Sequence, residues 1–160
     1  MVSLIKQPWP PRPRPRVCGA TALMPVGLIA EMFASVHDSS TPGNVRPVLR
    51  CLLQEHSGGR HHDLAWELDD ASEGEVWAQW ADGRRPDTFQ VVPDCNTLSG
   101  PTPKDEACIL YAGHPGCHTW QYTDPEHEAI ENSPEFQRAL TTVLDAIVRR
   151  APEPSRDGDG

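Results

Sequence analysis

The fold of this chain depends on the stretch Cys108-Ile-Leu-Tyr-Ala-Gly-His114-Pro-Gly-Cys117-His118. A related stretch lies upstream, Cys51-Leu-Leu-Gln-Glu-His56-Ser-Gly-Gly-Arg-His61-His62. Each stretch runs from a cysteine through a short spacer to His-x-Gly and then to a second histidine. The spacer before the first histidine has four residues upstream and five downstream. We therefore interpret the chain as two units that share one motif.

The motif has a spacing that suits a metal ion. Structural zinc is held by four ligands in a tetrahedron, usually thiolates and imidazoles. A tight His-x-Gly turn can bring two imidazoles near one point, and Gly58 and Gly116 supply the backbone freedom for that turn. One more cysteine precedes each motif, Cys18 in the first unit and Cys95 in the second. Each unit therefore contains four candidate ligands.

The two units give two sets of candidate ligands. The second set is Cys95, Cys108, His114 and His118. The first set is Cys18, Cys51, His56 and either His61 or His62. Adjacent side chains on an extended segment point to opposite sides, so only one of the last two should bind the metal. We expect one or two zinc ions, and Cys95 could alternatively complete the first site.

Three other interpretations of these residues stay open at this point. Both units could present free thiols and surface histidines in ordinary turns. In an exported protein, Cys95 and Cys108 could instead form a disulfide bond. Cys117 is left over, either as an incidental small residue, as a substitute ligand or as a reactive thiol beside an imidazole.

The second motif resembles a pattern found in small uncharacterised actinobacterial and phage proteins of zinc-ribbon-like or zinc-knuckle-like type. The matching residues are Cys108, Gly113, His114, Gly116 and His118, with Cys95 upstream. The first motif departs from the pattern, because Glu55 replaces the glycine and Arg60 lengthens the spacing between the histidines. The resemblance implies zinc binding and implies no activity.

The composition limits the size of the core and the class of partner. Of the 160 residues, 38% are apolar, below the roughly 45–50% usual for a packed domain, and such chains often gain stability from metals or partners. Four of the 14 basic residues and none of the 23 acidic residues lie in residues 1–16, so the remaining chain has a net charge of −13. An acidic body repels phosphate backbones, which argues against nucleic-acid binding.

The sequence shows no secretory signal and no apolar run long enough for a membrane span. We therefore expect a cytoplasmic protein with reduced thiols and no membrane association, in which cysteine mixed with histidine indicates metal. Its five cysteines are an odd number, so at least one has no partner in any paired scheme.

The remaining patterns predict an α+β fold. Three alternating runs, residues 64–68, 76–80 and 88–92, predict a small antiparallel meander flanked by the two Cys/His turns, with Trp66, Trp80 and Phe89 on its buried face. A short amphipathic helix is expected over residues 26–36, and a strand within residues 45–53. An amphipathic C-terminal helix should begin after Ser133-Pro134, a capping serine followed by proline at the first helical position.

The predicted domain organisation has three parts. Residues 1–16, rich in proline and arginine, should form a disordered arm. Residues 17–150 should form a single small domain, whose two units span about 17–92 and 93–150. Residues 151–160 should form a disordered tail. Translation starting at Met24 is an alternative that would remove Cys18.

Three functions follow from these features. The first is a non-catalytic, zinc-stabilised adaptor that binds a protein partner. The alternative is a small zinc-dependent enzyme of hydrolase type, with Cys51, His56 and His61 or His62 holding the ion and an open fourth position. The third is a nucleic-acid-binding zinc module. We favour the adaptor, because no motif of a known catalytic type is present and the body is acidic.

Overall fold

The computed structural model describes residues 13–36, 44–70, 72, 74–102 and 104–150. The predicted arm therefore lies mostly outside the described residues, and the predicted tail lies entirely outside them. The chain divides into two compact units, Met1–Thr123 and Asp124–Gly160. The α+β prediction is confirmed, with two small antiparallel sheets, helices and two Cys/His clusters.

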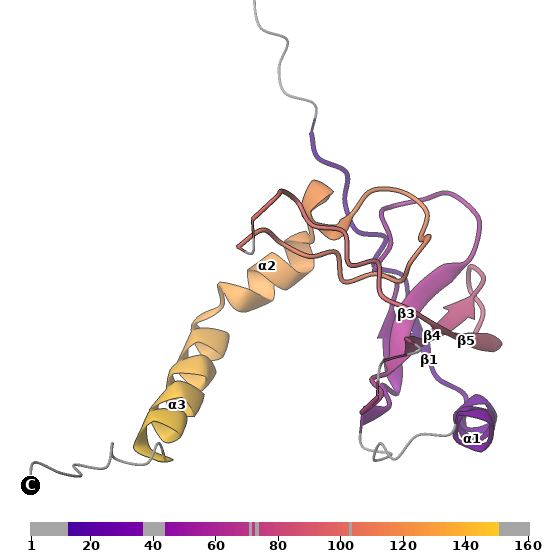
Figure 1. Ribbon diagram of the computed structural model, residues 1–160, viewed down its shortest axis with the longest axis horizontal. Coiled ribbons are helices and arrows are strands. Elements are labelled where there is room, and N and C mark those ends of the chain that lie inside the picture. Colours follow the sequence, from indigo (N-terminus) through magenta and orange to yellow (C-terminus); the bar gives the residue numbers. More distant parts are fainter. Residues whose placement is uncertain (1–12, 37–43, 71, 73, 103, 151–160) are drawn as a thin grey trace, which may run out of the picture. The chain divides into compact units, whose positions relative to one another are not determined.

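The larger sheet is the predicted meander (Figure 1). Its three antiparallel strands follow one another in the order β3 (His61–Trp66), β4 (Glu75–Trp80) and β5 (Thr88–Val92). As predicted, Trp66 and Trp80 are buried, while Phe89 is half-buried. Trp77, which the alternation of β4 did not assign to the core, is also buried. Its neighbours Val76 and Ala78 are buried too, so both faces of the central strand β4 are covered.

The smaller sheet pairs β1 (Thr21–Leu23) with β2 (Val48–Arg50), which is shorter than the strand expected over residues 45–53. Between these strands, the predicted helix α1 spans Val26–Ser35 and buries Met32. Figure 1 shows α1 near the end of the larger sheet at which β3 finishes. There the ring of Phe33 meets the edge of Trp66, with 4.8 Å between ring centroids.

The segment before β1 is hydrogen bonded on both sides. The Val17 amide donates to the Thr123 carbonyl at 2.9 Å, and on the other side the Cys18 amide donates to the Leu53 carbonyl at 2.7 Å. The Gly19 amide donates in the same way to Cys51. This segment is therefore part of the folded unit, and Cys18 is fixed within it.

The compact unit Asp124–Gly160 contains two helices. Helix α2 (Pro125–Glu131) begins at Asp124, whose carboxylate accepts from the His127 amide at 3.1 Å. Helix α3 (Pro134–Arg150) begins as predicted after Ser133, whose hydroxyl accepts from the Phe136 amide at 3.2 Å. Several apolar side chains of α3 are exposed, namely Phe136, Leu140, Val143 and Leu144. Among the described residues, no helix is both long enough and apolar enough to cross a membrane.

Candidate metal centres

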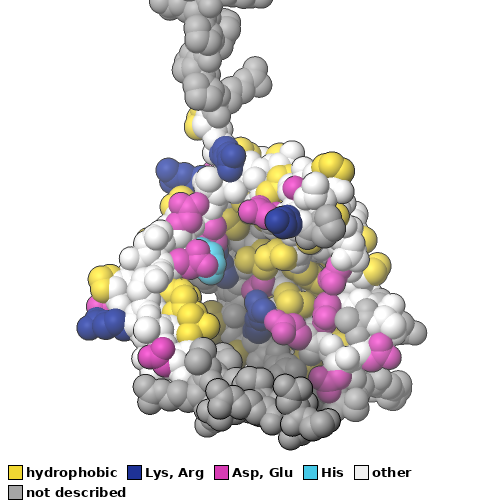
Figure 2. Space-filling model, turned by 60° about the vertical axis from the view of Figure 1, so that its left-hand side comes forward, with side chains coloured by type: hydrophobic (Ala, Val, Ile, Leu, Met, Phe, Trp, Pro, Cys, Tyr) yellow, Lys and Arg dark blue, Asp and Glu magenta, His cyan; other side chains and the backbone are white. Residues whose placement is uncertain are grey.

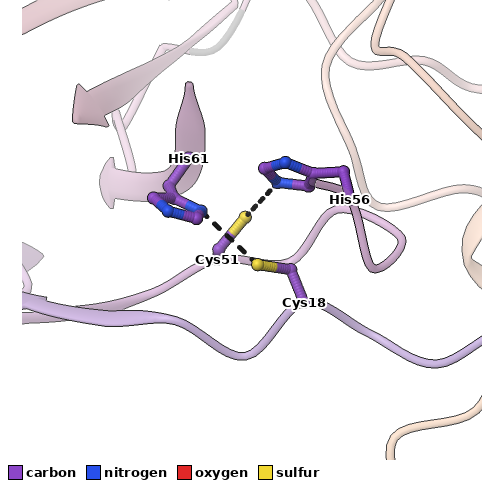
Figure 3. A group of neighbouring side chains, drawn as sticks. All are labelled: Cys18, Cys51, His56 and His61. Carbon is purple, nitrogen blue, oxygen red and sulfur yellow. Dashed lines mark hydrogen bonds between the residues drawn. The ribbon is translucent and has the colours of Figure 1, made fainter. Parts of the chain in front are cut away.

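The first Cys/His cluster consists of Cys18, Cys51, His56 and His61 (Figure 3). Each residue offers one ligand atom, and the four atoms all lie within 4.8 Å of one another. The Cys18 Sγ is 3.4 Å from Nδ1 of His61, and the Cys51 Sγ is 3.7 Å from Nε2 of His56. Cys18 therefore lies next to the other three residues in the structure, although it is far from them in the sequence.

The alternation of β3 decides between the two adjacent histidines. His61 is buried and belongs to the cluster, as the first residue of the strand. His62 lies on the opposite face, where its ring packs against Tyr111 with 5.1 Å between centroids. Successive side chains of a strand point to opposite faces, so His62 cannot join the same site.

The second cluster consists of Cys95, Cys108, His114 and His118, and no residue is exchanged between the two clusters. The Cys108 Sγ is 3.4 Å from Nε2 of His114, and the Cys95 Sγ is 3.6 Å from Nδ1 of His118. The turn carrying the histidines requires a left-handed backbone at Gly116, where φ is 81°, and the first unit has the same feature at Gly58, where φ is 85°.

The distances within the clusters match a tetrahedral site. With metal–sulfur and metal–nitrogen bonds of about 2.3 and 2.0–2.1 Å, a sulfur and a nitrogen on adjacent corners of a tetrahedron are about 3.6 Å apart. The four sulfur–nitrogen contacts given above, two in each cluster, run from 3.4 to 3.7 Å. All five cysteines are free thiols, so no disulfide joins Cys95 to Cys108. Each cluster could therefore hold a metal ion.

The outer nitrogens of the first-cluster imidazoles have acceptor partners. Nδ1 of His56 lies 2.7 Å from the Gly58 carbonyl, and Nε2 of His61 lies 2.6 Å from a carboxylate oxygen of Asp82. A carbonyl or carboxylate oxygen accepts, so the outer nitrogen carries the proton and the inner nitrogen keeps its lone pair. Metal-binding histidines usually have such partners.

The second cluster orients its imidazoles differently. The outer nitrogen of His114 lies 3.3 Å from the Pro115 carbonyl, a longer contact than those in the first cluster. The ring of His118 stacks on Trp120, with 4.8 Å between centroids and an interplanar angle of 16°. An aromatic face therefore supports this ring and limits its rotation.

Asp82 is a residue that the sequence analysis did not single out, although its carboxylate contacts the first-cluster histidine His61. The predicted first strand, residues 64–68, did not include His61. In the structure β3 begins at His61, which pairs with Trp80, so the turn after β4 comes close to the histidine. Asp63 accepts the Arg50 amide at 2.7 Å. Burial raises the pKa of the Asp63 carboxyl to about 6.

The thiols of the two clusters differ in their surroundings. Burial raises the pKa of the Cys51 thiol to about 12. Burial also acts to raise the pKa of Cys95, but hydrogen bonds with Thr97 oppose it, and the net effect lowers that pKa. The thiolate is the form that binds a metal. A metal ion at the first cluster must therefore displace a firmly held proton from Cys51.

Two hydrogen bonds join the segments that carry the two clusters. The Cys117 amide donates to Oε1 of Gln54 at 3.0 Å, which links the second turn to the first. A short hydrogen bond from the Tyr122 hydroxyl to the Leu52 carbonyl makes a second link. Cys117 itself belongs to neither four-residue cluster.

Comparison with models of known protein families, with curated proteins and with solved structures gives no match for this chain. The resemblance of the second motif to small zinc-ribbon-like proteins therefore stays a prediction. The function has to be argued from the clusters and their surroundings.

Proposed function

We propose that this chain is a non-catalytic protein-interaction module whose fold is stabilised by two zinc ions. The observation that carries the proposal is the pair of four-residue clusters, each with two thiols and two imidazoles within 4.8 Å of one another. Zinc is the metal typical of a tetrahedral site with two sulfur and two nitrogen ligands. The free thiols fit a reducing compartment such as the cytoplasm.

The number of ligands favours a structural role over a catalytic one. A catalytic zinc usually keeps three protein ligands and leaves its fourth position to water or substrate. A hydrolase built on Cys51, His56 and His61 would need that open position. Cys18 supplies a fourth donor at this place, with its Sγ 3.4 Å from the nearest imidazole nitrogen.

The distribution of charge favours a protein partner over a nucleic acid. On the face shown in Figure 2, acidic side chains are widely scattered, and the described basic side chains stand apart from one another. Nucleic-acid binding usually requires a continuous basic patch or stripe. The net charge of −13 beyond residue 16 supports the same choice.

Metal content per chain tests the proposal, measured by elemental mass spectrometry on the untagged, full-length protein. We expect two zinc ions in the natural protein and one in each of His61→Ala and His114→Ala. His62→Ala is the matched control for the first site, because it removes the adjacent imidazole on the opposite face of β3, and it should retain two. A protein that carries no zinc under reducing conditions would contradict the proposal.

A further inference from the structure

A cavity of about 390 Å³ lies between the segment 53–60, which carries His56 of the first cluster, and the turn that carries His114 of the second cluster. Most of its wall comes from the segment between the first-cluster ligands, and the rest comes from Pro115 and Gly116 of the second turn. This volume lies in the range of small-ligand sites, roughly 300–1,000 Å³. The residues that line it are Leu53, Gln54, Glu55, His56, Gly58, Gly59, Arg60, His62, Pro115 and Gly116.

His62 gives this cavity a hydrogen-bond acceptor. Its Nδ1 lies 3.0 Å from the Arg60 carbonyl, so that nitrogen carries the proton and Nε2 keeps a lone pair. Nε2 has no protein partner among the residues that the structure describes.

Two further acceptors line the same cavity. The carboxylate of Glu55 has no side-chain partner within the described part of the chain, and its residue is exposed. Oε1 of Gln54 accepts one hydrogen bond, from Cys117, and an amide oxygen has two lone pairs. The cavity therefore offers a carboxylate, an imidazole nitrogen and an amide oxygen.

The one cationic side chain in the wall is already neutralised. Arg60 forms an ion pair with Asp87, and the same nitrogen lies 3.3 Å from the Gln79 carbonyl on β4. Its positive charge is therefore balanced at the wall by Asp87, while its buried Nε has no hydrogen-bond partner among the described residues. The net negative charge of the chain beyond residue 16 favours the approach of a cation to the protein.

We propose that this cavity binds the guanidinium group of an arginine presented by a partner protein. A guanidinium has five N–H donors in a planar fork and no acceptor, which complements a wall rich in acceptors. The aliphatic part of an arginine side chain can pack on apolar surface, here the exposed ring of Pro115. The inference rests on the proposed function, since it names the chemistry of the partner that an interaction module would bind.

The test is a titration of the zinc-loaded, full-length, ¹⁵N-labelled protein with N-acetyl-arginine amide, followed by amide chemical shifts. N-acetyl-citrulline amide is the matched control probe, because it has nearly the same shape and no charge. We expect saturable shifts at Gly58, Gly59 and Gly116, with binding at least about tenfold weaker for citrulline, which corresponds to about 1.4 kcal/mol. Equal binding of the two probes, or shifts confined to other places, would overturn the proposal.

Two variants sharpen this result. Glu55→Gln should weaken arginine binding several-fold, because it removes the exposed carboxylate at the cavity, whereas Glu106→Gln, an exposed acid outside the cavity, should leave it unchanged. Equal effects of the two substitutions would show a non-specific charge effect and overturn the proposal. Zinc-loaded protein that does not bind arginine refutes the cavity alone. If the protein as purified under reducing conditions carries no zinc and still binds arginine at these glycines, the proposed function is refuted and the cavity is not. If it carries no zinc and does not bind arginine, both are refuted.

Discussion

Asp82 fixes the orientation of the His61 imidazole in the first cluster. Its carboxylate oxygen lies 2.6 Å from Nε2, although the side chain is mostly exposed. Partners of metal-binding histidines contribute about 10–100-fold to metal affinity. Because Asp82 is exposed, we expect Asp82→Ala to weaken zinc binding at the first site by about tenfold, the lower end of that range.

Competition with a chromophoric chelator measures this effect. The second site of the same protein is the internal reference, because Asp82 contacts none of its ligands. Equal weakening at both sites would mean that the substitution disturbs the whole fold rather than one imidazole.

Cys117 is the thiol that the two clusters leave over. It is half-buried, and its backbone amide is held by Gln54. If four thiolates bind metal, a thiol reagent should modify one cysteine per chain rapidly in the zinc-loaded protein and five after chelation and denaturation. Cys117→Ser should abolish the rapid reaction, as followed by absorbance. Rapid modification of two or more cysteines in the zinc-loaded protein would contradict the ligand sets.

Some of the helices and strands could be predicted from the sequence. Alternation predicted the three strands of the meander, although β3 begins at His61 and not at residue 64. Alternation also predicted that only one of the two adjacent histidines could join the first cluster, and in the structure this residue is His61. Ser133 and Pro134 predicted the start of α3, because capping is a local interaction. Local patterns are informative wherever the partners lie close together in the sequence.

The elements that depend on distant partners could not be predicted in this way. The strand β1 has only three residues, and its pairing with β2 spans the whole of α1. The cavity next to the first cluster depends on the hydrogen bond between Gln54 and the Cys117 amide, and these two residues are 63 positions apart. No periodicity within either segment carries that information.

Gly74, at the start of β4, has a backbone that no other residue could adopt without strain. Its φ is 119°, and an added Cβ would lie 2.1 Å from the Val92 carbonyl oxygen of β5. Gly74→Ala should therefore force the two strands apart and reduce the free energy of unfolding by at least about 3 kcal/mol. Chemical unfolding of the zinc-loaded protein, followed by tryptophan fluorescence, measures the change.

Gly83, after the other end of β4, provides the matched control. Its φ is also positive, 64°, but an added Cβ would meet nothing within 4 Å. Gly83→Ala should therefore cost only the left-handed conformation, about 1–2 kcal/mol. If both substitutions cost the same, the close approach to β5 is not the cause.

The compact unit Met1–Thr123 has a small apolar core. The proposed metal ions would add cross-links to this core. The largest fully buried side chains are Trp66, Trp77 and Trp80. Because binding energy of a structural metal is also folding energy, chelation should unfold residues 13–123. We expect loss of near-ultraviolet circular dichroism from the buried tryptophans, and recovery on adding zinc. A chelated protein that keeps this signal would show that the core folds without metal.

The stability of the zinc-loaded protein should also fall as the pH is lowered below neutral. The metal-bound state has deprotonated thiolates and imidazoles, whereas the unfolded state binds protons at the same groups. The unfolded state therefore binds more protons, so stability rises with pH. Thermal unfolding measured from pH 5 to 8 checks the sign, and a melting temperature that rises on acidification would contradict it.

The segment before β1 has a mechanical consequence. Arg16 and Thr123 form a parallel bridge, with hydrogen bonds from Val17 to Thr123 and from Thr123 to Pro15. If the first unit is stretched from its two ends, parallel terminal segments slide along each other, and their hydrogen bonds bear the load together instead of opening one by one. The force then reaches Cys18 two residues further on, so tension at the N-terminal end would act directly on the first metal cluster.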